Sequence, residues 1–147
     1  MANVKFDTNS RVYLSNDGEG SGNTVFGYNA GANIDSGDNN NVFIGHNVAD
    51  ADMTNATENV GIGYSALSSL TTGDSNITIG YDAGYAITTS SENILIGARS
   101  GDSITDQAGG IIAIGAGSCG ALTSGIKNTA IGHVALSVEV AGDDSTA

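Results

Sequence analysis

Apolar and polar residues alternate in a short phrase that recurs seven times along this chain. The phrase opens with Asn in six of the copies, contains Val or Ile in alternate positions and closes with Gly, as in "NVFIG" at 41–45. A period of two carried by β-branched residues predicts a β-strand rather than a helix. The spacing is 17 or 18 residues, as read from the closing glycines Gly27, Gly45, Gly63, Gly80, Gly97, Gly115 and Gly132.

Each predicted strand offers three positions between the opening Asn and the closing Gly. The first and third share one face because side chains alternate along a strand. The third is the most uniform, and we expect it to form the buried core ladder: Phe26, Ile44, Ile62, Ile79, Ile96, Ile114 and Ile131. The middle position varies from Gly61 to Phe43, which suits a less constrained face. The third residue after each closing Gly is small or β-branched, which predicts a second inward-facing bend or strand.

A unit of this length holds about two short strands and two turns, and it cannot bury its own apolar face. Stacking on neighbouring units solves that problem, so the sequence predicts an all-β fold, a parallel β-roll or β-solenoid of about seven coils. Three regions are expected: 1–22 as an N-terminal capping and docking segment, 23–136 as the repeat domain, and 137–147 as a C-terminal cap with an acidic tail. Caps are needed because the ends of a sheet expose unpaired backbone groups.

Charge and composition exclude several classes of function. The net charge is −12, with only four basic residues, which disfavours nucleic acid or anionic lipid as a partner. No stretch is apolar over the length needed to insert into a membrane. The lone Cys119 rules out an intrachain disulfide framework and a cysteine-based zinc site, and we interpret it as a small buried residue.

Five of the seven residues that follow the closing glycines are aromatic or His: Tyr28, His46, Tyr64, Tyr81 and His133. Such a column could contact other subunits of an oligomer, or it could stack against the rings of a glycan. The opening Asn residues are expected to bond to one another and to adjacent turns.

Catalysis and metal binding are not expected. His46 and His133 lie five repeats apart, too far to share a site within one chain, and no nucleophile elbow, phosphate loop or HExxH motif is present. The acidic group Asp35, Asp38, Asp50 and Asp52 could be imagined as a calcium site, but a solvated acidic face is favoured because calcium-binding repeat and EF-hand motifs are absent. No catalytic residue, cofactor or metal is therefore predicted.

The phrase N-x-x-I-G-[Y/H]-x-A, in "NVFIGHNVA" (41–49), "NVGIGYSAL" (59–67), "NITIGYDAG" (76–84) and "NTAIGHVAL" (128–136), resembles the head repeat of trimeric autotransporter adhesins and related repeats in bacteriophage, especially cyanophage, virion structural proteins. The resemblance implies a left-handed parallel β-roll that assembles as a homotrimer. The chain has no heptad run or anchor segment, so a phage structural protein is expected rather than an adhesin.

These observations lead to one expected function and one alternative. The first is a trimeric capsid decoration, or cement, protein on the surface of the phage particle, with the major capsid protein or other virion proteins as partners. Its docking residues would be Lys5, Phe6, Arg11 and Tyr13, which lie outside the repeats and include two of the four cations. The alternative is a tail-fibre or spike module that binds a host surface glycan through the Tyr/His column. An ice-binding solenoid would need a regular Thr array in the middle position of the strands, which is missing.

Overall fold

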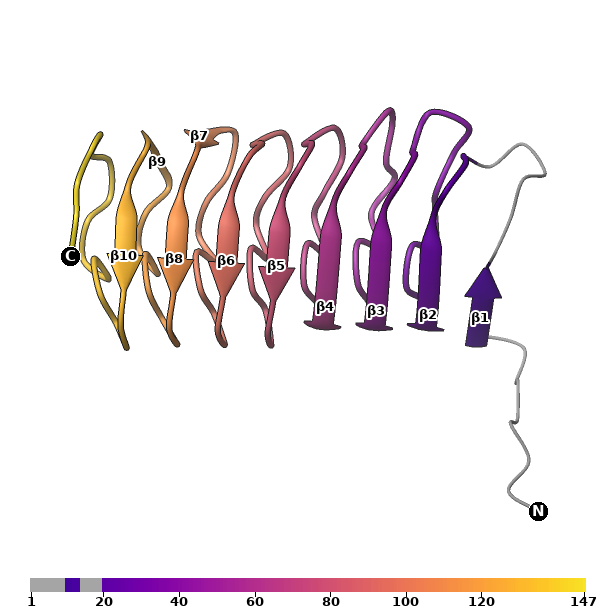
Figure 1. The fold of residues 1–147 in the computed structure, drawn as a ribbon, viewed down its shortest axis with the longest axis horizontal. Coiled ribbons are helices and arrows are strands. Elements are labelled where there is room, and N and C mark those ends of the chain that lie inside the picture. Colours follow the sequence, from indigo (N-terminus) through magenta and orange to yellow (C-terminus); the bar gives the residue numbers. More distant parts are fainter. Residues whose placement is uncertain (1–9, 14–19) are drawn as a thin grey trace, which may run out of the picture.

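The chain winds into a parallel β-solenoid in the computed structural model, which describes residues 10–13 and 20–147 (Figure 1). These residues form strands and turns and contain no helix. The fold class predicted from the repeat is therefore confirmed. The strands are β1 Ser10–Tyr13, β2 Thr24–Tyr28, β3 Val42–His46, β4 Val60–Tyr64, β5 Ile77–Ile79, β6 Ile94–Ile96, β7 Gln107–Gly109, β8 Ile112–Ile114, β9 Ser124–Ile126 and β10 Thr129–Ile131.

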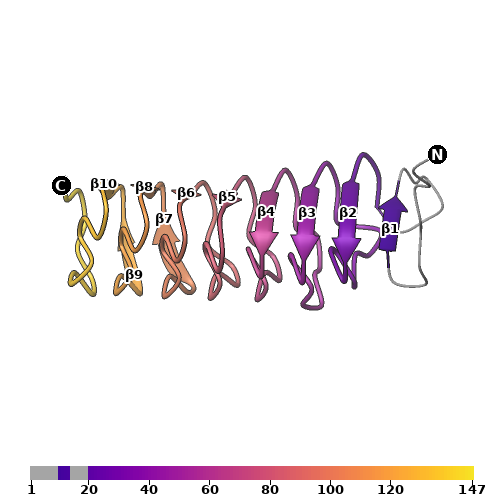
Figure 2. The ribbon, with the colours of Figure 1, turned by 90° about the horizontal axis from the view of Figure 1, so that it is seen from below.

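The main sheet has eight strands in the order β1-β2-β3-β4-β5-β6-β8-β10. From β2 onward all neighbours are parallel, and each residue pairs with its equivalent one repeat away, as Ile44 does with Ile62. Seven parallel strands thus delimit six complete turns of the solenoid. The strands follow one another along the long axis, with β1 and β10 toward opposite ends of the rod (Figures 1 and 2).

The two flanks of the repeat domain lie against its ends. β1 pairs antiparallel with β2, Ser10 opposite Tyr28, and covers the outer edge of the first repeat. Residues 137–147 continue in the register of the repeats: the Thr123 N–H donates to Val140 O at 2.9 Å, and the Thr129 N–H donates to Ser145 O at 2.8 Å. The C-terminal region predicted to be a cap thus completes the coil that begins with β10, and its last residues start the next coil, since Ala141 pairs with Ser124 and Thr146 with Thr129.

The side opposite the main sheet is built mostly from turns. Among residues 10–13 and 20–147, only β7 and β9 form a second sheet, in the C-terminal half. In the other coils this side still bonds to the next coil through the backbone, for example from the Thr54 N–H to Thr71 O at 2.8 Å. The expectation of two strands in each coil therefore holds for two coils of the described chain and is wrong for the others.

The prediction of the core ladder is wrong by one residue in every strand. The buried column is the middle position: Val25, Phe43, Gly61, Thr78, Leu95, Ala113 and Ala130. The predicted ladder faces outward on the other side of the sheet: Phe26, Ile44, Ile62, Ile79, Ile96, Ile114 and Ile131. Phe26 is 56% exposed and Ile131 61%, whereas Phe43 and Leu95 are 0% exposed.

Size complementarity explains how a variable column can be buried. A Cβ added to Gly61 would lie 2.7 Å from Val48 Cγ1 and 3.3 Å from Phe43 Cδ1, so neighbouring large side chains already fill that space. Likewise, a Cβ on Gly101 would meet Leu95 Cδ1 at 3.0 Å. Interiors are packed to near-crystalline density, so a large residue in one column requires a small one beside it. Variation in size along a column is therefore compatible with burial.

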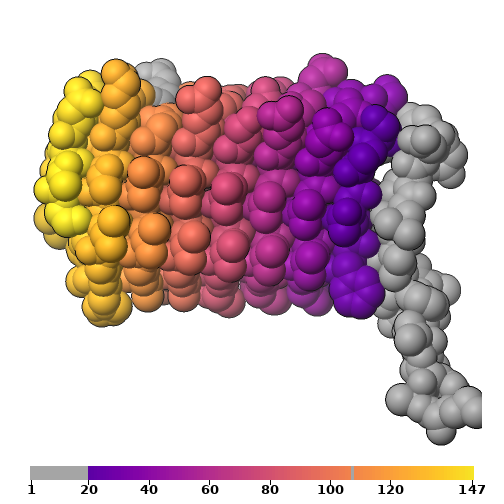
Figure 3. Space-filling view, viewed as in Figure 1, coloured from indigo at the N-terminus to yellow at the C-terminus, as the bar shows by residue number. Residues whose placement is uncertain are grey.

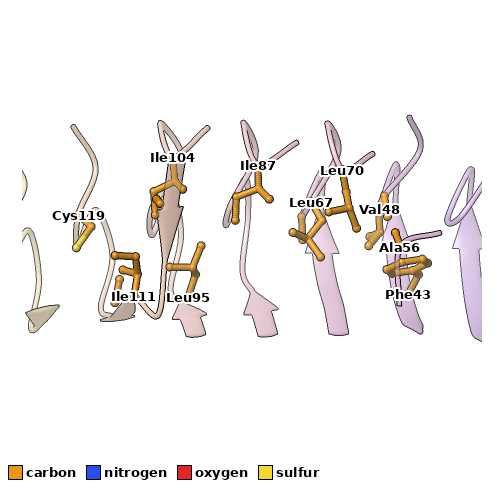
Figure 4. Packing of buried hydrophobic residues seen from close by; sticks show 14 of the residues in the cluster. Phe43, Val48, Ala56, Leu67, Leu70, Ile87, Leu95, Ile104, Ile111 and Cys119 are labelled. Carbon is orange, nitrogen blue, oxygen red and sulfur yellow. The ribbon is translucent and has the colours of Figure 1, made fainter. Parts of the chain in front are cut away.

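Two further columns close the core. The third residue after the closing glycines is buried in six repeats, which confirms the predicted inward bend: Ala30, Val48, Ala66, Ala83, Ser100 and Ser118. A column in the turns, which the sequence analysis did not identify, packs against it from the opposite side: Met53, Leu70, Ile87, Ile104 and Leu122. Figure 4 shows four of these side chains, Val48, Leu70, Ile87 and Ile104, inside their coils.

The opening asparagines form a buried hydrogen-bonded ladder, as predicted. The Asn59 N–H donates to Asn41 Oδ1 at 2.8 Å, and the Asn76 N–H donates to Asn59 Oδ1 at 3.0 Å. The side-chain amide of Asn59 also donates to Gly73 O at 2.8 Å. In the repeat that departs from the pattern, Ile111 joins the core, and its N–H still donates to Asn93 Oδ1 at 3.1 Å. The ladder thus satisfies the polar groups that stacking buries.

Candidate functional site: an apolar outer face

The outward side of the main sheet is a long surface made of three columns, which we call the outer face. The first column is Thr24, Val42, Val60, Ile77, Ile94, Ile112 and Thr129; the second is Phe26, Ile44, Ile62, Ile79, Ile96, Ile114 and Ile131; the third, at the margin where each strand ends, is Tyr28, His46, Tyr64, Tyr81, Ala98, Ala116 and His133. All of these residues are partly or fully exposed.

The outer face contains no Asp, Glu, Lys or Arg, although the chain as a whole has 16 acidic residues. Strands about 4.8 Å apart, with about 3.3 Å per residue, give the face a footprint of about 500 Å². Contiguous apolar patches of this size on a soluble protein commonly mark an interaction site. The space-filling view shows how regularly side chains line up in rows along the rod (Figure 3).

Four rings of the third column stack on one another along the axis. The centroids of Tyr28 and His46 are 4.8 Å apart, those of His46 and Tyr64 5.1 Å, and those of Tyr64 and Tyr81 5.5 Å. The planes of successive rings differ by only 10–18°. We call these four residues the aromatic ladder.

The ladder ends under an arginine. The Arg99 guanidinium carbon lies 5.8 Å from the centre of the Tyr81 ring, and Arg99 Nε lies 4.0 Å from Asp82 Oδ2. His133, the other predicted member of the column, is separated from Tyr81 by the two repeats that carry Ala98 and Ala116. The structure thus brings together four of the five predicted column residues and leaves the fifth apart.

This stacking decides which surfaces of the rings are available. Both faces of His46 and Tyr64 are covered by neighbouring rings, and Tyr81 is covered by Tyr64 and Arg99. Sugar rings stack on open aromatic faces, so the geometry does not favour a glycan track. The ring edges and polar tips face outward instead.

Several Asp carboxylates in the turns accept hydrogen bonds from backbone N–H groups. Asp38 is fully buried, and its carboxylate accepts hydrogen bonds from the Asp35 and Ala56 N–H groups, each at 2.7 Å. Burial raises the pKa of Asp38, and the two backbone hydrogen bonds partly oppose that effect. Asp74 accepts the Thr57 N–H at 2.7 Å in the same way. In the part of the chain that the structure describes, no group of three or more His, Cys, Asp or Glu side chains is arranged to hold a metal ion.

The remaining candidate residues lie elsewhere. Cys119 is buried in the core, where desolvation raises the pKa of its thiol. Lys5 and Phe6 fall outside the described residues. Arg11 and Tyr13 belong to β1, where their backbones pair with Gly27 and Val25. An open pocket near the C-terminal end has walls made largely of backbone and small side chains: Ser124, Gly125, Ile126, Ala141, Gly142 and Asp143.

No protein-family model, no curated protein and no solved structure matches this chain. Among residues 10–13 and 20–147, none lies in a helix with the length and apolar character that crossing a membrane requires.

Proposed function

We propose that this chain is a structural protein of a bacteriophage virion, which assembles as a homotrimer through the outer face and decorates the capsid surface as a cement protein. The observation that carries the proposal is a charge-free apolar face that runs the length of an otherwise acidic rod. The phage context and the number of three subunits come from the resemblance of the repeat phrase.

The parallel sheet itself supports assembly. All-parallel sheets are found almost only where both faces are covered by other parts of a protein. Here the inner face packs on the core, whereas the outer face still exposes Phe26, Ile77 and Ile131. Other copies of this chain would cover it, since copies related by a rotation axis along the rod present the same face to that axis.

Docking to the shell is assigned to the N-terminal segment. In a trimer with parallel subunits, three copies of β1, which carries Arg11 and Tyr13, lie at the same end of the rod. Lys5 and Arg11 are two of the four cations of the chain, and Phe6 and Tyr13 could insert into apolar pockets of the shell. Decoration would then be mechanical: each trimer would bridge neighbouring capsid subunits and hold them together.

Assembly is tested with Ile79→Asp and Ile96→Asp, each on the outer face, and with Thr72→Asp as an exposed control in a turn. Native mass spectrometry should find trimers of the wild type and of the control. The two face variants should be mostly monomeric, because burying an unpaired carboxylate in an interface is strongly unfavourable. A wild-type protein that remains monomeric at micromolar concentration would contradict the proposed assembly.

Docking is tested by deleting residues 2–20 and mixing the protein with capsids of the virus that encodes it. The truncated chain should remain a trimer and no longer sediment with the particles, whereas the full chain should co-sediment. If capsid binding survives the deletion, the docking segment is misassigned. If the full chain does not bind capsids at all, the decoration role is wrong.

A further inference from the structure

The outer face poses a problem of register for any assembly of this chain. The second column carries Ile in six of its seven coils, and the first column carries Thr, Val or Ile, all of them β-branched, in every coil. Two copies could therefore slide past each other by one coil, about 4.8 Å, and still bury almost the same apolar contacts. A closed oligomer needs one register, so some part of the face has to differ from coil to coil.

The third column is where the face loses its repetition. Its first four coils carry the aromatic ladder of Tyr28, His46, Tyr64 and Tyr81, and the next two carry only Ala98 and Ala116. Stacking holds the four rings in nearly parallel planes, so their outward edges form a rigid comb with a spacing of 4.8–5.5 Å. After a slip by one coil, Tyr81 of one copy would lie beside Ala98 of the other copy instead of beside its Tyr81.

We infer that the aromatic ladder sets the axial register between parallel copies of this chain, an inference that rests on the proposed function. Another copy is the partner that fits, because it has the same axial repeat along its whole length.

The copies lie parallel because their N-terminal segments have to reach one shell from the same end. In an antiparallel pair, the ladder of one copy would instead lie over Ala98 and Ala116 of the other. The two arrangements place different coils in contact, so cross-linking distinguishes them.

The test uses single cysteines in three successive coils of the second column: Ile62→Cys, Ile79→Cys and Ile96→Cys, each made with Cys119→Ala. The variants are mixed in pairs, assembled and oxidised, and linked peptides are identified by mass spectrometry. Disulfides form only between nearby Cα atoms, about 4.4–6.8 Å apart, so each link reports which coils face each other. Parallel copies in register give links between identical positions. A one-coil slip links 62 to 79 or 79 to 96, and an antiparallel pair links 62 to 96.

Identical-position links should exceed adjacent-coil links at least tenfold in this background. Adding Tyr64→Ala with Tyr81→Ala should raise adjacent-coil links to a comparable amount. The control, Val60→Ala with Ile77→Ala, removes apolar surface from the same two strands without touching the ladder, and should lower the yield of links but keep their pattern.

Three results would overturn the inference. If adjacent-coil links stay rare in the Tyr64→Ala/Tyr81→Ala protein, the ladder does not set the register, although the proposed trimer stands. If links between positions 62 and 96 dominate, the copies are antiparallel. A monomeric parent protein, seen by native mass spectrometry, would remove the proposed assembly and the register device together.

Discussion

At the scale of the residue, neighbours in one strand have opposite surroundings although their side chains are chemically alike. Leu95 and Ile96 are adjacent aliphatic residues of β6; Leu95 is fully buried, and Ile96 is half-buried on the outer face. Burial, rather than hydrophobicity, therefore decides what each contributes to folding and what it contributes to assembly.

We predict that Leu95→Ala lowers the free energy of unfolding by about 2–5 kcal/mol, because it leaves a cavity in the core. Ile96→Ala should lower it by about 1 kcal/mol or less in the dissociated chain, since only part of its surface is removed from water. Urea unfolding over a series of chain concentrations measures both. Equal losses at low concentration would mean that the two faces of the sheet are assigned the wrong way round.

The tight coils also place residues other than Gly in the left-handed region. Val134 has a φ of 53°, which is unfavourable for a β-branched side chain, and it is 50% exposed. Its N–H donates to Ala116 O at 2.9 Å, so the coil holds this conformation through the backbone.

Val134→Asn should therefore stabilise the fold by about 0.5–1 kcal/mol, because Asn tolerates this conformation better than Val. Val138→Asn is the matched control: Val138 is 88% exposed and is not among the residues with positive φ. Thermal unfolding should rise for the first variant and stay within a degree or two for the second. A lower melting temperature for Val134→Asn would show that its apolar contacts outweigh backbone strain.

At the scale of the element, each of the seven parallel strands of the main sheet has a glycine near its C-terminal end, and six of these glycines pack on the glycine of the next coil. A Cβ on Gly63 would lie 2.3 Å from Gly80 O, and Gly63 has a φ of 141°, a conformation that side chains rarely adopt. Gly132, in the last of these strands, has a similar φ of 137°, but a Cβ there would meet only Ala135 Cβ, at 3.9 Å. Comparing a substitution at Gly63 with the same substitution at Gly132 therefore separates backbone strain from steric conflict between coils.

Gly132→Ala should lower the free energy of unfolding by about 1–3 kcal/mol through backbone strain alone. Gly63→Ala should lower the free energy of unfolding by about 1–3 kcal/mol more than Gly132→Ala does, because its new methyl group also forces two coils apart. Denaturant unfolding of the two variants at one chain concentration gives the difference. Equal losses would mean that the coils can shift to accommodate a methyl group.

At the scale of the whole molecule, an acidic rod carries one neutral face. With a net charge of −12, copies of the chain repel each other at long range, whereas the outer face offers apolar contact at short range. Screening shortens the range of the repulsion, to about 3 Å at 1 M salt from about 30 Å at 0.01 M.

Assembly should consequently tighten as salt rises. We expect the dissociation constant of the proposed trimer to fall at least several-fold between 0.01 and 0.5 M NaCl, as measured by sedimentation equilibrium. An assembly weakened by salt would indicate that ion pairs, rather than the outer face, join the copies.

Much of the fold could be predicted from the sequence because the repeat is strict. The closing glycines marked the period, alternation marked the strands, and the asparagines predicted a ladder that the structure confirms through Asn41, Asn59 and Asn76. The turn column that includes Leu70 and Ile87 was missed, although its spacing of 17 residues repeats as regularly as that of the glycines. In the candidate site, the sequence predicted the column of Tyr and His residues. It did not predict that stacking would cover the faces of their rings.

The period of the solenoid can be read from the sequence alone, because glycines, asparagines and β-branched residues recur every 17 or 18 residues. Which side of each strand faces inward depends on packing between the coils. Alternation gives two faces without saying which is inside, and here both carry apolar residues. The choice depends on how Phe43 and Leu95 fit beside Gly61 and Gly101, and these contacts exist only once the coils close and stack.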